Sequence, residues 1–104
     1  MKSTQILSAL ENVSEVIKQY QIQNFGEVTV SEAQRHLQKQ QSVREATSHV
    51  LWMNESAKLF VENNSLNKAQ RWLSFGQGVA WNQGLSSIDD FRHANMPSGV
   101  LFAK

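Results

Sequence analysis

Apolar residues recur every three or four positions along most of this chain, and this spacing is the feature that most limits its fold. The first segment spaces its apolar residues by four, three, four and three positions: Ile6, Leu10, Val13, Ile17 and Tyr20. Residues at such intervals share one face of an α-helix, whereas a half-buried strand would alternate apolar and polar residues. The pattern predicts a helix over about residues 4 to 24, capped by Ser3 or Thr4 and stopped at Gly26.

The same spacing returns in the second third of the chain, but the sequence leaves the start of this helix ambiguous. Residues 29–32 and 42–45 both match a capping box, in which a hydroxyl and a carboxylate satisfy backbone donors of the first turn. Between the two boxes, residues 38–41 are all polar and interrupt the apolar face. Residues 31–63 therefore form either one long helix or two helices split near Gln41. We expect one long helix, because neither Gly nor Pro stands at the interruption.

A third helix is predicted over about residues 66 to 83, and one of its faces is unusual. Gly76 and Ala80 are small and four residues apart, so another helix can approach closely along this strip. Gly76 and Gly78 each cost a helix about 1 kcal/mol relative to Ala. Close packing or a ligand contact is therefore expected at this strip.

The last part of the chain predicts one more short element. Ser86 and the two aspartates that follow are typical of a helix start, and this helix is expected to reach about Asn95. Pro97 then ends the pattern, and residues 100–104 form an apolar tail that we expect to dock on the body or on another subunit. The predicted fold is a single all-α domain over residues 1–104. It is an antiparallel bundle of three long helices with a short C-terminal helix and an extended tail.

The composition indicates in which cellular compartment the protein works and whether it contacts a membrane. The 104 residues include no Cys, which excludes disulfide bonds and thiolate-bound zinc and is typical of a reducing cytoplasm. The first apolar run is interrupted by Glu11, too early for a signal peptide, and no stretch is long enough to cross a membrane. We expect a soluble cytoplasmic protein with no membrane contact.

No arrangement of residues typical of catalysis is found, so we expect a non-enzymatic protein with no cofactor and no metal. Residues 76–81 begin like a dinucleotide-binding fingerprint, but Trp81 stands where the third Gly is needed and no strand precedes it. Glu45 and His49 lie four residues apart and could donate two metal ligands, as could Asp89 and His93. Solvated ion pairs are the simpler interpretation, because a stable site needs further ligands.

The basic residues suggest nucleic acid only weakly. Arg35, His36, Lys39 and Arg44 form a loose group, and the region around them resembles a helix-turn-helix with a poorly fitting second helix. The formal net charge of the whole chain is only +1, far from the balance of a dedicated nucleic-acid binder. A solvated basic face is the better interpretation, and we do not expect nucleic acid as the partner.

The aromatic residues of the third predicted helix are the sharpest feature of the sequence. Rings at helical spacing are usually core, yet Trp and Arg are also enriched as anchors at protein interfaces. A third interpretation is that a cation and a ring together hold an anionic, ring-bearing ligand such as a nucleotide. The candidate partner- or ligand-binding residues are Lys68, Arg71, Trp72, Phe75, Gly76, Gln77 and Trp81.

Two stretches of the chain resemble known proteins. They are Lys-Ala-Gln-Arg-Trp-Leu-Ser-Phe-Gly-Gln-Gly-Val-Ala-Trp at residues 68–81 and Ile-Asp-Asp-Phe-Arg at residues 88–92. They resemble small helical proteins encoded by bacteriophages and prophages, in which an Arg-Trp-Leu-Gly-Phe-x-Gln-Gly-like helix precedes an Ile-Asp-x-x-Arg turn. The resemblance covers about residues 54–95. Ser74 stands where that pattern has Gly, and Gly76 stands where it tends to be apolar.

The resemblance implies a phage accessory role that blunts a host defence or redirects a host enzyme, and it brings no catalytic residue. We therefore expect a protein that self-associates through a helical face and docks on a host protein. The alternative is a protein that sequesters nucleotides or cyclic nucleotides, a style known among small helical phage oligomers. A second alternative is a nucleic-acid-binding regulator.

Overall fold

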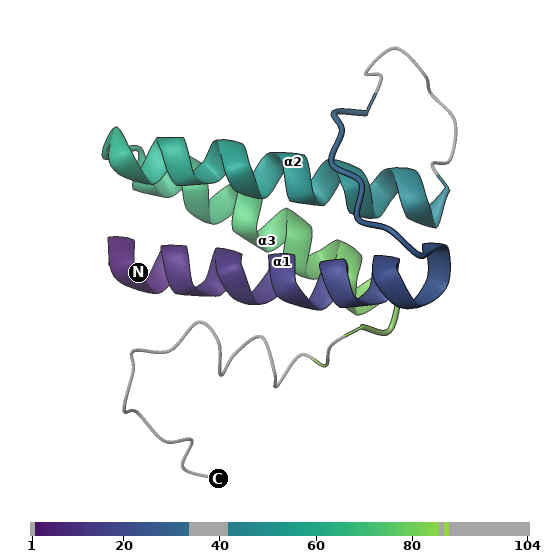
Figure 1. The fold of residues 1–104 in the computed structure, drawn as a ribbon. Helices are drawn as coiled ribbons and strands as arrows, with labels where there is room; N and C mark the ends of the chain where they lie inside the picture. Colours follow the sequence, from purple (N-terminus) through teal and green to yellow (C-terminus); the bar gives the residue numbers. More distant parts are fainter. Residues whose placement is uncertain (1, 34–41, 86, 88–104) are drawn as a thin grey trace, which may run out of the picture.

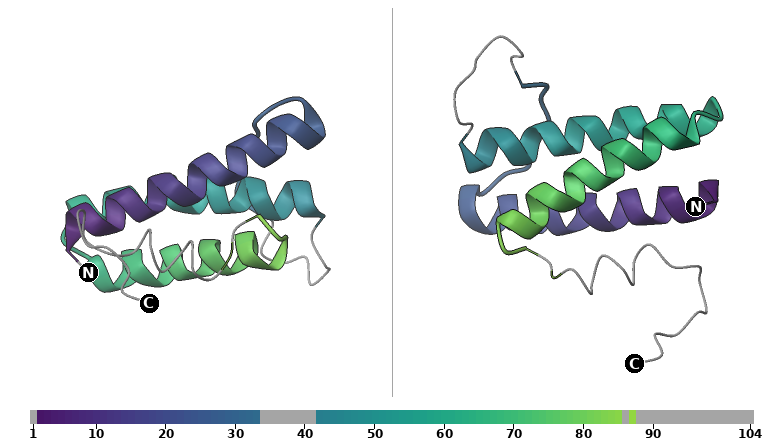
Figure 2. Two further views of the ribbon diagram at one scale, coloured as in Figure 1. Left: turned by 90° about the horizontal axis from the view of Figure 1, so that it is seen from below. Right: turned by 180° about the vertical axis from the view of Figure 1, so that it is seen from behind.

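Three helices make up the secondary structure of the described part of the chain. The computed structural model describes residues 2–33, 42–85 and 87, and these contain α1 (Ser3–Phe25), α2 (Val43–Glu62) and α3 (Leu66–Asn82) with no strand. Figure 1 shows that α2 runs opposite to α1 and α3, and the two further views in Figure 2 show that all three lie side by side. The all-helical three-helix prediction is confirmed. The predicted short helix over residues 86–95 and the apolar tail lie outside the described residues, apart from Ser87.

The first helix has the predicted extent but a different cap. Lys2 is the N-cap residue, and its backbone N–H donates to Gln5 Oε1 at 2.6 Å. Ser3 and Thr4 lie inside the helix, so the prediction that one of them caps it is wrong. Gly26 ends the helix as predicted, because its φ of 78° is left-handed and its N–H donates to the Ile22 carbonyl oxygen at 3.0 Å.

The second helix starts twelve residues later than predicted, at Val43 instead of residue 31, and the prediction of one long helix over residues 31–63 is wrong. Residues 28–33 are not helical, and α2 begins at Val43. Ser42 caps it, since the Ser42 Oγ accepts a hydrogen bond from the Glu45 N–H at 3.1 Å. The second of the two capping boxes is therefore the one that starts the helix.

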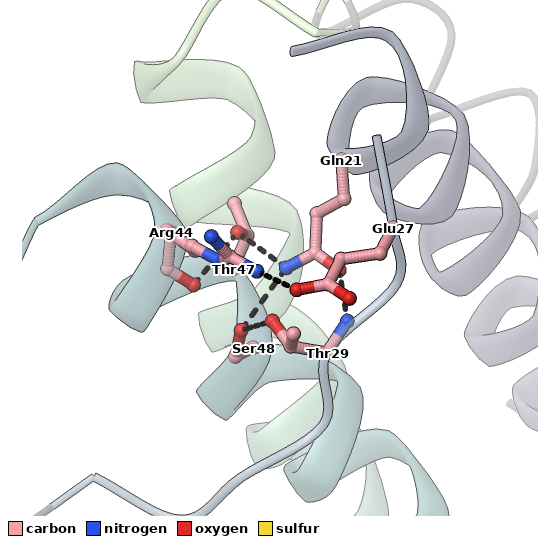
Figure 3. Close-up of polar contacts among 6 residues, drawn as sticks. All are labelled: Gln21, Glu27, Thr29, Arg44, Thr47 and Ser48. Carbon is pink, nitrogen blue, oxygen red and sulfur yellow. Dashed lines mark hydrogen bonds and ion pairs between the residues drawn. The ribbon is translucent and has the colours of Figure 1, made fainter. Parts of the chain in front are cut away.

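The segment that follows α1 stays extended because side chains and a carbonyl outside it accept its backbone donors. Figure 3 shows the first of these bonds, from Thr29 to Gln21. The Thr29 N–H donates to Gln21 Oε1 at 2.9 Å, and the Ser31 N–H donates to the Ser48 carbonyl oxygen at 3.3 Å. The Ala33 N–H donates to His49 Nδ1 at 3.0 Å. These long-range bonds replace the bonds that a helix would make within the segment.

One core joins the three helices. Its fully buried apolar side chains come from every helix, and the main ones are Ile6, Leu10, Val13, Ile17, Val50, Leu51, Ala57, Ala69, Leu73 and Ala80. A buried amide also joins two of the helices: Asn54 Nδ2 donates to Ser14 Oγ at 2.9 Å, which ties α2 to α1 at one register. None of the helices in the described part of the chain has the length and apolar character needed to cross a membrane.

At Gly76, α3 packs closely against both of the other helices. A Cβ placed on Gly76 would lie 2.9 Å from Val50 Cγ1 and 3.6 Å from Val13 Cγ1. The close packing predicted for the strip of Gly76 and Ala80 is therefore real, but α1 and α2 of the same chain supply it. The strip is covered, and a second molecule has no access to it.

Candidate functional site

Five rings follow one another along the outer junction of α2 and α3, and we call them the aromatic row. Each ring contacts the next, in the order Phe75, His49, Trp52, Trp72 and Phe60. His49 stacks on Trp52 with centroids 5.6 Å apart, and Trp72 meets Phe60 edge to face at 4.8 Å. Such contacts are favoured by the ring quadrupoles and hold each ring in one orientation. The row is therefore a continuous and ordered aromatic surface.

The row forms because rings from two antiparallel helices meet across their junction. On α3, Trp72 and Phe75 are three residues apart and share one side of the helix. On α2, His49 and Trp52 are likewise three apart, and Phe60 follows two turns later. The side chains of the two helices therefore interleave instead of packing only within one helix.

Solvent reaches the row along its length. Phe75 is 52% exposed, and the other four rings are only partly buried. Next to Phe75 lies an open depression of about 470 Å³ between Ala46 of α2 and Gly78 and Asn82 of α3. Large exposed rings beside a depression are typical of surfaces that contact a partner, whereas scattered single apolar residues are ordinary.

Two cations border the row on the α3 side. Lys68 Nζ lies 4.4 Å from the centroid of Phe60 and 5.8 Å from that of Trp72, so the ammonium is held on ring faces by cation–π attraction. Arg71 is exposed, precedes Trp72 and lines a second open depression, of about 500 Å³, with Gln70 and Ser74. The junction thus combines an apolar surface with positive charge at one border.

A buried polar network behind the row holds its α2 side in place (Figure 3). Gln21 Nε2 donates to Thr47 Oγ1 at 2.9 Å and to Ser48 Oγ at 3.1 Å, while its Oε1 accepts from Thr29. Because the same extended segment donates to His49 Nδ1 through Ala33, the network also orients the first ring of α2. Arg44 pairs with Glu27 and lies over the Phe25 ring, which fastens the segment at its other end.

The negative charge in the middle of α2 faces α1 instead of the row. Lys58 Nζ lies 2.6 Å from Glu11 Oε1 and 3.3 Å from Glu55 Oε1. The hydrogen bond and the charge of Lys58 hold the pKa of Glu11 below its ordinary value. The hydrogen bond that Lys58 donates to Glu11 in turn raises the pKa of Lys58, although burial lowers it. These groups are a surface ion-pair cluster away from the aromatic row.

The structure brings together four of the seven candidate residues from the sequence. Lys68, Arg71, Trp72 and Phe75 lie at the row or along its border. Gly76 and Gln77 are buried, so they belong to the packing of α3 and not to its exposed side.

Trp81 is exposed but lies elsewhere on α3. At about 100° per residue, it is turned roughly 120° around the helix from Phe75. Trp81 is 53% exposed, nearly the same as Phe75. Trp81 therefore does not belong to the aromatic row, because Phe75 and Trp81 lie on different sides of α3.

Sequence reasoning missed the α2 half of the row. The candidate residues above do not include Trp52, helical spacing places Phe60 in the apolar seam of the second helix, and His49 is a candidate only with Glu45 as a metal pair. A signal for Trp52 existed, because it stands outside the apolar seam through Val50, Met53 and Ala57 on the same helix. Within the described residues, no group of three His, Cys, Asp or Glu side chains could hold a metal ion.

Fold and site together define a three-helix protein with an aromatic, cation-bordered surface on two of its helices. Comparison with protein-family models, with curated proteins and with solved structures returns no match to this chain. The aromatic row and its cations are therefore the features that bear on function.

Proposed function

We propose that this chain is a non-enzymatic interaction protein that docks on a partner protein through the aromatic row. The observation that carries the proposal is the row itself: five rings in mutual contact, all reached by solvent and bordered by Lys68 and Arg71. Rings that are already ordered lose little conformational freedom when a partner covers them. Trp and Arg at the centre of a patch are the residue types that most often anchor protein interfaces.

The phage-type resemblance extends this proposal to a host protein as the partner and to the cytoplasm as the compartment. That role predicts inhibition or redirection of one host protein, with no chemistry carried out by this chain. Self-association is also part of the proposal. Because the strip of Gly76 and Ala80 is covered, a second copy would have to contact another face of the helices. Light scattering of the wild-type chain would detect the mass of a dimer.

A matched pair of variants tests the docking surface. Phe75→Ser removes an exposed ring of the row, while Trp81→Ser removes an equally exposed ring from another side of the same helix. Both changes are at the surface and should alter the free energy of unfolding by about 0.5 kcal/mol or less. Capture of bacterial host proteins on the immobilised full chain should lose a band with Phe75→Ser and keep it with Trp81→Ser.

The outcome that contradicts the proposal is equally specific. If folded Phe75→Ser and Trp52→Ser proteins retain every captured protein, the row is not the docking surface. Ile22→Ser, at an exposed position of α1, controls for the general loss of apolar surface.

Nucleotide binding is the second candidate, and the placement of Lys68 favours it. An ammonium held on ring faces beside an exposed Arg71 offers positive charge and a stacking surface to one planar anion. A thermal-shift screen with mono- and cyclic nucleotides tests it. A ligand at a hundred times its dissociation constant should stabilise the protein by about 2.7 kcal/mol. Unchanged melting with every nucleotide would remove this candidate.

Nucleic-acid binding has less support. Arg35, His36 and Lys39 lie outside the described residues, and Arg44 already pairs with Glu27. A gel shift whose affinity falls steeply with salt would be needed to revive this candidate.

A further inference from the structure

On the α3 side of the aromatic row, every charged residue is a cation. The whole of α3, from Leu66 to Asn82, contains no Asp or Glu, and its charged residues are Lys68 and Arg71. Neither cation forms an ion pair within the described residues. The charged residues in the middle of α2 are Glu55 and Lys58, which are engaged with each other and with α1.

The two cations are placed to act together. They are three residues apart on one helix, so their Cβ atoms are about 5–6 Å apart. Lys68 is held on the rings of Phe60 and Trp72, so its charge stays next to the apolar surface instead of moving freely in water. Two carboxylates one helical turn apart on a partner would match this spacing.

The opposite end of the row has the opposite sign. Glu45 precedes His49 by one turn of α2 and is exposed, with its carboxylate accepting a hydrogen bond from Ser42 at the helix start. From Glu45 to Phe60, α2 rises about 22 Å. The charges therefore differ along the row. Lys68 and Arg71 lie toward the Phe60 end, where the exposed Glu62 also ends α2, and Glu45 lies at the other end beside Arg44, which is paired with Glu27.

We propose that the partner segment that binds the aromatic row is an acidic amphipathic helix of about three to four turns. Its apolar side covers the rings, and a pair of carboxylates at one end meets Lys68 and Arg71. This inference rests on the proposed function, since it names the chemistry of the partner at that same surface. A protein segment fits better than nucleic acid, because a phosphate backbone would meet only two cations here and would face Glu45 at the other end.

The experiment is a peptide selection on the full chain. Random displayed peptides of about 16 residues, enough for four turns, are selected in parallel on the wild type and on Phe75→Ser. Enriched peptides are then synthesised and their dissociation constants measured by fluorescence anisotropy. The proteins compared are the wild type, the double variant Lys68→Gln/Arg71→Gln, and Lys2→Gln/Lys18→Gln, which removes the same charge from α1.

We expect the enriched peptides to carry at least two acidic residues three or four positions apart. They should bind the Lys68→Gln/Arg71→Gln protein about tenfold more weakly and the α1 double variant unchanged. The difference should shrink between about 50 mM and about 500 mM salt, because the ion pairs lie at a border that solvent reaches.

Failure of this inference differs from failure of the proposed function. The enriched peptides could lack acidic residues and require Phe75 but not Lys68 and Arg71. That result would overturn the proposal that the partner is acidic and would leave docking at the row intact. Peptides enriched equally on Phe75→Ser, or no enrichment at all, would overturn both. A single-stranded oligonucleotide that binds the row while acidic peptides do not would also overturn the inference.

Discussion

The two glycines inside α3 allow the packing of this protein to be measured separately from helix propensity. Gly76 and Gly78 are two residues apart in one helix, so replacing either by Ala should bring the same gain of about 0.8–1.0 kcal/mol in helix propensity. Their surroundings differ. A Cβ on Gly78 would meet nothing within 4 Å, while a Cβ on Gly76 would lie 2.9 Å from Val50 Cγ1.

The expected magnitude follows from that distance. Carbon atoms in contact prefer about 3.5–4.0 Å, so the added methyl would sit roughly half an ångström or more too close. Val50 is fully buried and β-branched, so it has one strongly preferred rotamer in a helix and no free space to move into. Overpacking of this kind costs about 1–3 kcal/mol. Gly76→Ala should therefore be less stable than Gly78→Ala by about that amount.

Urea or thermal unfolding followed by circular dichroism measures the difference. For a chain of this size, 1 kcal/mol corresponds to about 4–8 °C in melting temperature, so the two variants should separate clearly. We expect Gly78→Ala to melt above the wild type and Gly76→Ala at or below it. The slope of the urea transition should be the same in both, which would show that the unfolded states are comparable.

The Val50→Ala variant tests whether contact with Val50 causes the loss of stability. Val50→Ala destabilises the protein by leaving a cavity, but it also removes the atom that the new methyl would strike. Gly76→Ala should then become stabilising in the Val50→Ala protein, with a coupling of about 1–3 kcal/mol. Equal stabilities of Gly76→Ala and Gly78→Ala in the wild-type background would show that α3 does not pack as closely as described.

Three further predictions concern the rest of the fold. Gln21→Ala should cost about 2–4 kcal/mol because it leaves buried hydrogen-bonding groups without their partner, and hydrogen exchange of the Thr29 amide should speed up; unchanged exchange would contradict the role of the network. Ser42→Ala should cost about 1 kcal/mol as the loss of a helix cap, measured by urea unfolding, and no cost would mean that α2 does not start there. Lys58 lowers the pKa of Glu11 in the folded state, so the ion pair stabilises the protein above about pH 4.3, the ordinary pKa of Glu. This stabilisation is lost as the pH falls through the folded-state pKa of Glu11. The contribution should stay below about 1 kcal/mol at this exposed position, and Glu11→Gln should flatten that part of the pH profile.

Local spacing in the sequence was enough for two of the three helices. The apolar intervals placed α1 and α3 within a residue or two of Ser3–Phe25 and Leu66–Asn82, and Gly26 marked the end of α1. Helical periodicity and a left-handed stop are properties of short stretches of chain, so a sequence can reveal them without knowledge of the fold.

The start of α2 and the membership of the site were decided by tertiary structure. Residues 29–32 match a capping box, but Gln21, Ser48 and His49 accept the backbone donors of this segment. These acceptors are 8 to 17 residues away from the donors, and the bonds keep the segment extended. The sequence likewise could not show that Gly76 faces its own core or that Trp52 completes a row with Trp72, because both depend on how α2 packs against α3.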